Sequence, residues 1–141
     1  MTYFQLSAED IIRRLRWVML AVILIDTVCT LSGQPPGYWH DHSKVNEIEP
    51  VTRFFLVRGV LPFAVGAVLY LVGAFCVVSF TPTRIALTLL FTFLLAHFWG
   101  ATSWLLYHFH YGVRCQNLFE IAVAALVTLA LGKAGKPASQ N

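Results

Sequence analysis

Four long hydrophobic stretches dominate this chain and constrain what it can fold into. They cover about residues 15–33, 54–80, 85–107 and 116–132 of a sequence of 141 residues. These lengths are close to the roughly 20 residues that a helix needs to cross a bilayer. Hydrophobic residues make up 57% of the chain and charged residues 12%, which is about half the charged share of a soluble domain. The sequence therefore predicts an all-α integral membrane protein with a single membrane domain over residues 1–141.

The segments between these stretches are short, and short connections place consecutive helices antiparallel. We expect outer loops at residues 33–50 and 108–115 and a tight link at residues 81–84. An antiparallel four-helix transmembrane bundle is therefore the predicted fold. The second span is expected to cover about residues 54–80, beginning within residues 50–58, with a kink at Pro62.

The basic residues predict the orientation of the chain. One side of the membrane would hold Arg13, Arg14, Arg16, Arg84, Lys133 and Lys136, and the other side Lys44, Arg53 and Arg114. Because cytoplasmic loops are enriched in Lys and Arg, we expect both termini in the cytoplasm, at a bacterial inner membrane. No small-residue cleavage site ends the first apolar stretch, so that span is expected to remain in the mature protein. The basic residues are spread along the chain, which argues against nucleic acid as a partner.

Each span carries one ionisable residue at middle or outer depth. These residues are Asp26, Arg58, His97 and Glu120. A charge inside the bilayer costs about 3 kcal/mol on insertion scales, so each of these side chains is expected to face inward. We predict that all four meet in the outer half of the bundle, around a polar cavity that opens outward. Such a network would suit a proton path, a substrate pocket or a metal site. The alternative is a structural network that only fixes the register of the helices.

Two His-x-His pairs lie in the predicted outer loops. They are His40 with His42, and His108 with His110, and the first loop adds Glu47 and Glu49. Imidazole and carboxylate groups are common ligands of zinc and copper, so these six residues form a candidate metal site. Solvated loop histidines and a pH-sensing role are the alternatives. Haem is not expected, because no second span carries a histidine opposite His97. Cys29 and Cys115 fall near the outer ends of their spans, where a disulfide is an open alternative.

One stretch of the chain resembles a known group of proteins. Asp26 and Thr30 lie late in the first span, and Glu47 and Pro50 open the second. This pattern is similar to that of an uncharacterised group of small bacterial multi-span membrane proteins, in which Glu-x-Asn-Pro opens the second span. Glu49 stands here where that pattern has Asn. The resemblance implies a small inner-membrane protein and brings no activity with it.

Three kinds of function are compatible with these features. The first is an accessory or interaction protein whose polar cavity binds a metal or a small ligand, with the lipid bilayer, other membrane proteins or further copies of itself as partners. The second is an intramembrane metal-dependent or acid/base enzyme that uses Asp26, His97 and Glu120. The third is a small transporter or a proton- or ion-conducting oligomer. The sequence favours the first, because it contains no recognisable nucleophile motif.

Overall fold

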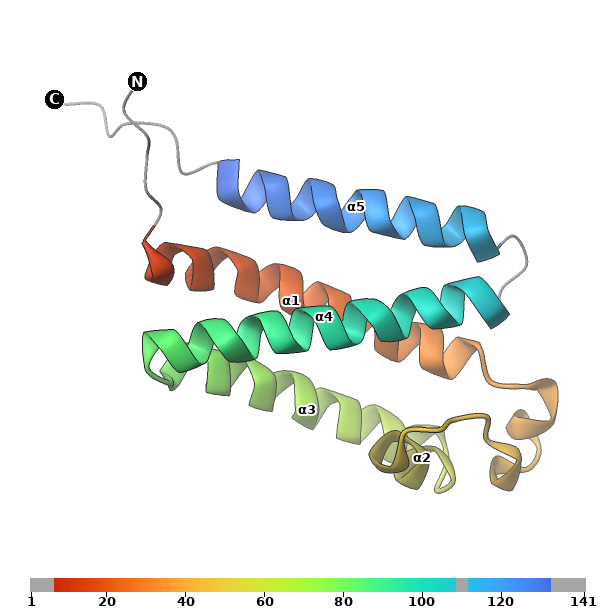
Figure 1. Cartoon of the computed structure of the whole chain (residues 1–141). Coiled ribbons are helices and arrows are strands. Elements are labelled where there is room, and N and C mark those ends of the chain that lie inside the picture. Colours follow the sequence, from red (N-terminus) through yellow and green to blue (C-terminus); the bar gives the residue numbers. More distant parts are fainter. Residues whose placement is uncertain (1–6, 109–111, 133–141) are drawn as a thin grey trace, which may run out of the picture.

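The computed structural model describes residues 7–108 and 112–132, and within these ranges all regular structure is helical (Figure 1). The long helices are α1 (Ala8–Ser32), α3 (Val60–Phe80), α4 (Thr83–His108) and α5 (Gly112–Gly132). Between α1 and α3 lie two short 3-10 helices, η1 (Pro36–Trp39) and η2 (His42–Lys44), and the short helix α2 (Pro50–Leu56). We refer to residues 33–59 as the connecting segment.

Four of the helices have the length and the apolar composition to cross a membrane. They are α1, α3, α4 and α5. Large apolar side chains such as Leu61, Leu95 and Trp99 remain exposed on their surfaces, as expected where lipid rather than water surrounds a helix. The predicted all-helical fold is therefore confirmed, and four helices with the length and composition of membrane spans indicate an integral membrane protein.

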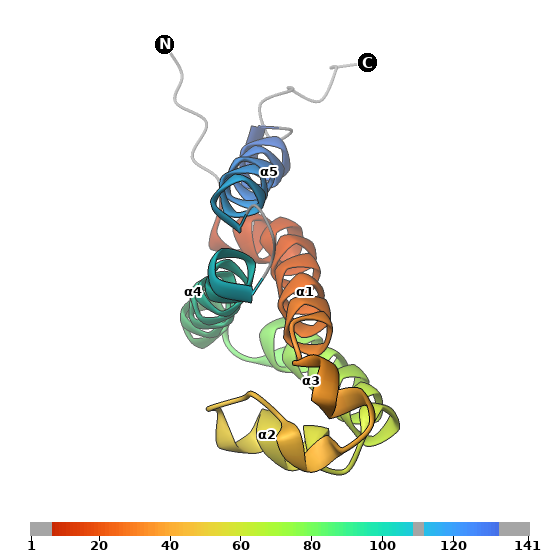
Figure 2. The same cartoon turned by 90° about the vertical axis from the view of Figure 1, so that its right-hand side faces the viewer.

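The most extensive packing joins α1 to α4, which run in the same direction although α3 separates them in the sequence. Figure 2 shows α5 and α3 on opposite sides of this central pair. Leu15, Met19 and Val22 of α1 are buried in one core with Ala86, Leu90 and Ala101 of α4. Small residues at a contact let helix backbones approach closely in a membrane, which explains why this face of α4 carries Ala86, Gly100 and Ala101.

The second span differs from the sequence-based prediction. The predicted span over about residues 54–80 is interrupted near its start, because α2 ends at Leu56 and α3 begins only at Val60. Gly59 separates them with a φ of 111°, a left-handed conformation that favours glycine. The predicted kink at Pro62 is wrong. Pro62 lies in the first turn of α3, where a missing backbone N–H leaves no helical hydrogen bond unmade.

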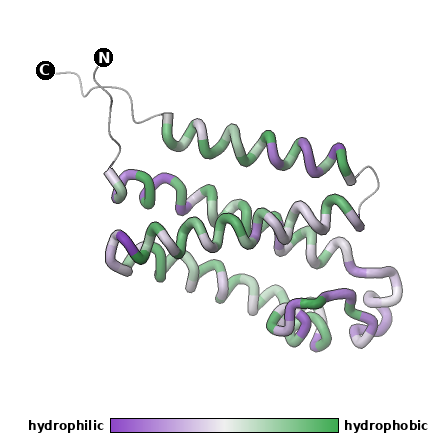
Figure 3. Tube along the Cα trace, in the orientation of Figure 1, coloured by the Kyte–Doolittle hydropathy of each residue, from purple (hydrophilic) through white to green (hydrophobic). Residues whose placement is uncertain are grey.

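The connecting segment has its own small core. Tyr38, Val45, Leu56 and Phe63 are buried together, and the Tyr38 hydroxyl donates to the Leu56 carbonyl at 3.1 Å. Figure 2 shows α2 lying across the end of the long helices rather than parallel to them. Figure 3 shows hydrophilic residues concentrated in this segment, whereas the middle of α3 and of α4 is mostly apolar. This arrangement places a polar, folded layer beside the start of α3, far from α5.

Candidate functional site

A cavity of about 690 Å³ lies where α1, α3 and α4 meet the connecting segment. Its polar lining comes from all four parts of the chain. Asp26 and Thr30 belong to α1, Tyr70 to α3, His97 and Ser103 to α4, and Glu47 and Glu49 to the connecting segment. Phe55, Phe63 and Trp104 supply aromatic walls. The volume lies within the usual range of small-molecule sites, about 300–1,000 Å³.

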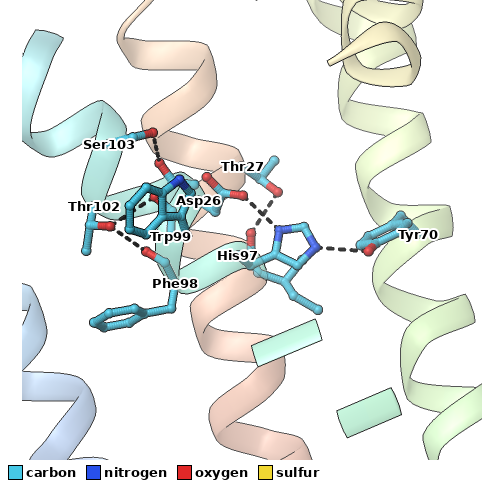
Figure 4. Close-up of polar contacts among 10 residues, drawn as sticks. Asp26, Thr27, Tyr70, His97, Phe98, Trp99, Thr102 and Ser103 are labelled. Atoms are coloured by element: carbon cyan, nitrogen blue, oxygen red, sulfur yellow. Dashed lines mark hydrogen bonds and ion pairs between the residues drawn. The ribbon is translucent and has the colours of Figure 1, made fainter. Parts of the chain in front are cut away.

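Three side chains from three helices form a hydrogen-bonded chain in this cavity. Figure 4 shows His97 between Asp26 and Tyr70. The His97 Nδ1 atom lies 2.8 Å from Asp26 Oδ2, and the His97 Nε2 atom lies 2.9 Å from the Tyr70 hydroxyl oxygen. When the imidazole is neutral and Asp26 is ionised, Nδ1–H donates to the carboxylate and Nε2 accepts the phenol proton. The carboxylate therefore fixes the tautomer in which His97 can act as a base toward Tyr70.

The other carboxylate oxygen of Asp26 is buried and has no hydrogen-bond partner among the residues described. Nearby hydroxyls do not reach it, because Thr27 donates to the Ile23 carbonyl at 2.8 Å and Ser103 donates to the Gly100 carbonyl at 2.7 Å. Gly100 provides the space for this carboxylate, since a Cβ atom there would lie 2.7 Å from both oxygens. Among the residues described, His97 is therefore the hydrogen-bond partner of the Asp26 side chain, and one carboxylate oxygen remains available to a bound molecule.

Two glutamates add negative charge on the side of the connecting segment. Glu49 caps α2, with its carboxylate accepting from the backbone N–H groups of Val51 at 3.0 Å and Thr52 at 2.6 Å. Burial alone would raise the pKa of Glu49, but these backbone donors outweigh it and hold the pKa below its ordinary value. Glu49 is therefore ionised at neutral pH. Glu47 Oε1 accepts from the backbone N–H groups of Ile48 and Glu49.

Only two of the four predicted intramembrane residues come together. Asp26 and His97 meet, as the sequence predicted, and their side chains are 16% and 21% exposed. The prediction that Arg58 and Glu120 join them is wrong. Arg58 lies in the break before α3, donates to the Phe54 carbonyl at 2.6 Å and covers the Phe54 ring at 3.4 Å. Glu120, on α5, accepts from the Gln116 side chain at 2.9 Å.

The predicted metal ligands do not gather into one site in the part of the chain that the structure describes. Within residues 7–108 and 112–132, no three His, Cys, Asp or Glu side chains are grouped so that they could hold a metal ion. His42 instead packs its ring on Tyr38, with the ring centroids 5.0 Å apart, and His108 packs on Trp104 at 4.4 Å. His40 is exposed, and His110 lies outside the described residues. Cys29 and Cys115 are free, so the alternative of a disulfide between them is not borne out.

Tyr70 is the site residue that sequence reasoning missed. It is the one tyrosine of a mostly apolar helix, ten residues after Val60, and this position inside a span was the available signal. Tyrosines near membranes usually mark the interface with water, so a tyrosine at depth indicates a polar partner.

The chain matches no known protein family, no curated protein and no solved structure.

Proposed function

We propose that this protein is a small membrane-embedded binding protein whose cavity takes an amphipathic molecule with a cationic head. The observation that carries the proposal is the cavity of about 690 Å³ with the Asp26–His97–Tyr70 chain in its wall. Ligand sites of this size combine apolar and aromatic walls with a few convergent polar groups, as this one does. An apolar body would contact Phe55, Phe63 and Trp104, and the head would lie near Asp26.

The charge of the lining favours a cation over a neutral or anionic head. Three acidic residues, Asp26, Glu47 and Glu49, line the cavity, and no Lys or Arg belongs to the described lining. Arg53 comes near it only by donating to the Glu47 backbone carbonyl at 3.2 Å. An ammonium group beside Asp26 would donate to the carboxylate oxygen that has no hydrogen-bond partner among the described residues, and a buried polar atom is costly to leave without one. Aromatic walls also attract cations through their ring faces.

The proposal includes a membrane topology. The four long helices would form one antiparallel bundle in a bacterial inner membrane, with both termini in the cytoplasm and the cavity on the outer side. Arg13, Arg14, Arg16 and Arg84 belong to the end away from the cavity, and Lys133 and Lys136 come after the last residue of α5 in the sequence. Lys44, Arg53, Arg58 and Arg114 belong to the cavity end. This bias supports cytoplasmic termini by the positive-inside rule.

Matched probes test the ligand class. Phenethylamine, phenethyl alcohol and phenylacetate share an aromatic body and differ in the charge of the head. We expect the amine to bind most tightly to the protein in nanodiscs, as measured by NMR on the indole N–H of Trp104. Asp26→Asn should weaken amine binding roughly tenfold, because a charge-assisted hydrogen bond contributes about 1.5–3 kcal/mol.

Glu120→Gln is the matched control, because it removes a carboxylate from α5 that does not line the cavity. It should leave amine binding unchanged. Binding of all three probes with equal affinity, insensitive to Asp26→Asn, would disprove the cationic head. If no probe shifts the Trp104 signal, the binding function itself is wrong.

A second candidate function is acid/base chemistry at Tyr70. In the hydrogen-bonded chain of side chains, the Asp26 carboxylate orients His97, and His97 contacts the Tyr70 hydroxyl. Many enzymes activate a nucleophile with this arrangement. Tyr70 is 43% exposed, so its oxygen can meet a molecule while Asp26 and His97 stay mostly buried. This candidate would make the bound molecule a substrate.

Phenylmethylsulfonyl fluoride tests the reactivity of Tyr70 without a known substrate. The phenol oxygen bonds to sulfur, the sulfur–fluorine bond breaks, fluoride leaves and the phenol proton passes to His97 Nε2. We expect mass spectrometry to show faster labelling of Tyr70 than of Tyr107, which is 76% exposed. Asp26→Asn and His97→Ala should each remove this difference. Equal labelling of the two tyrosines in the unsubstituted protein would exclude activation by His97.

A further inference from the structure

A second groove runs along the outside of α1 and α3, away from the cavity. It has a volume of about 450 Å³ and is lined entirely by apolar and aromatic residues. They are Trp17, Leu20, Ala21, Leu24, Leu71, Val72 and Phe75. From Trp17 to Leu24 the helix rises about 10 Å, at about 1.5 Å per residue. The groove therefore follows the axis of α1 over a length that matches part of a hydrocarbon chain.

A cation lies at one end of this groove. The Arg16 guanidinium carbon is 5.5 Å from the centre of the Trp17 ring and 5.0 Å from the centre of the Phe75 ring. Arg16 Nη1 donates to the Ser79 hydroxyl at 3.2 Å, near the end of α3. Trp17 and Phe75 belong to the groove lining, so the charge lies at the end of the groove toward the C-terminus of α3, and the apolar lining continues from there along α1 to Leu24. Hydrogen-bonding to Ser79 and contact with two rings hold the guanidinium at this point.

The charges around Arg16 favour an anion. Arg13, Arg14 and Arg84 belong to the same end of the long helices. Asp10, which also lies there, is already bonded to Arg13 at 2.6 Å and to the Ser7 hydroxyl at 2.8 Å. The buried Nε of Arg16 has no hydrogen-bond partner among residues 7–108 and 112–132. A guanidinium offers several N–H donors in a plane, which matches the oxygens of a phosphate.

We infer that the α1–α3 groove binds an anionic phospholipid, with its phosphate on Arg16 and one acyl chain along Trp17–Leu24. Basic residues beside an apolar surface between membrane helices are a recognised basis for binding anionic headgroups. The lipid would cover the exposed side chains of Trp17 and Leu24 on α1 and of Val72 on α3. This site shares no lining residue with the cavity at Asp26, so the test of one proposal does not decide the other.

Native mass spectrometry of the detergent-purified full chain tests the site with two lipids. Phosphatidylglycerol is anionic and phosphatidylcholine carries the same acyl chains on a zwitterionic headgroup. We expect phosphatidylglycerol to bind more tightly, and Arg16→Gln to weaken it roughly fivefold, since one basic residue contributes about 1 kcal/mol to anionic lipid binding. Arg13→Gln is the matched control, because Arg13 belongs to the same end but is paired with Asp10.

Two results would overturn the inference. One is equal binding of the two lipids to the unsubstituted protein, which would leave only an apolar groove. The other is an equal loss with Arg13→Gln and with Arg16→Gln, which would indicate a diffuse surface charge rather than a site. If Arg16→Gln does not fold, Ala21→Phe tests the groove instead, because the larger side chain fills the groove and leaves Arg16 in place. It should weaken binding of both lipids, and unchanged binding would exclude the groove.

Discussion

Replacing Tyr38 with alanine is expected to destabilise the connecting segment by about 3–5 kcal/mol, the range for truncating a large aromatic side chain in a core. Tyr38 is 0% exposed and packs with Val45, Leu56 and Phe63. Its hydroxyl also donates to the Leu56 carbonyl, the last residue of α2. The substitution therefore leaves both a void and an unpaired carbonyl at the point where α2 is held against α3.

Hydrogen exchange measured by mass spectrometry would locate this loss. Amides of α2 should exchange much faster in Tyr38→Ala while those of α1 and α4 keep their protection, because the connecting segment can open locally while the long helices stay folded. Tyr38→Phe removes only the hydroxyl and should cost about 1 kcal/mol. Trp39→Ala is the matched control, since Trp39 is the next residue and is 50% exposed. Similar exchange in Tyr38→Ala and Trp39→Ala would show that Tyr38 does not anchor α2.

The spans could be predicted from the sequence because they depend on local composition. A run of apolar residues becomes a helix in lipid whatever its neighbours are, since its backbone groups have no other partners there. The break between α2 and α3 was missed for a local reason as well. Val57–Arg58–Gly59–Val60 contains one charge and one isolated glycine, which a helix can also tolerate, so the left-handed conformation of Gly59 does not follow from composition.

The depth of each polar residue could be predicted, but its direction around the helix could not. Counting residues placed Asp26 and His97 at similar depth, and these two do meet. The direction of a side chain changes by about 100° with each residue, and a helix that is apolar all round gives no pattern from which to read its inner face. For this reason Tyr70 was missed and Glu120 was assigned to the wrong neighbours.

The central packing of α1 on α4 was also beyond the sequence. Short connections determine only that consecutive helices run in opposite directions, and they leave open which pair packs most closely. Here the parallel pair forms the centre. This pairing is what brings Asp26 of α1 against Gly100 and His97 of α4, so the site depends on a contact between helices that are not consecutive.

Substituting Gly100 with alanine is expected to reverse the usual effect of such a change in a helix. Alanine normally stabilises a helix by about 0.5–1 kcal/mol relative to glycine. At Gly100 the added Cβ would lie 2.7 Å from both oxygens of Asp26, so the carboxylate has to move or α1 and α4 have to separate. Overpacking of this kind costs typically about 1–3 kcal/mol. The Asp26–His97 hydrogen bond would be lost with it, and so would the tautomer that it fixes.

Gly73→Ala is the matched control for this prediction, because nothing lies within 4 Å of the Cβ that it would add. In thermal unfolding in detergent, Gly73→Ala should be neutral or stabilising and Gly100→Ala destabilising. The NMR signals of the His97 ring nitrogens should change in Gly100→Ala alone. Equal stabilisation by both substitutions would mean that Asp26 does not lie against Gly100. The cavity would then lack the carboxylate on which both its ligand preference and the activation of Tyr70 depend.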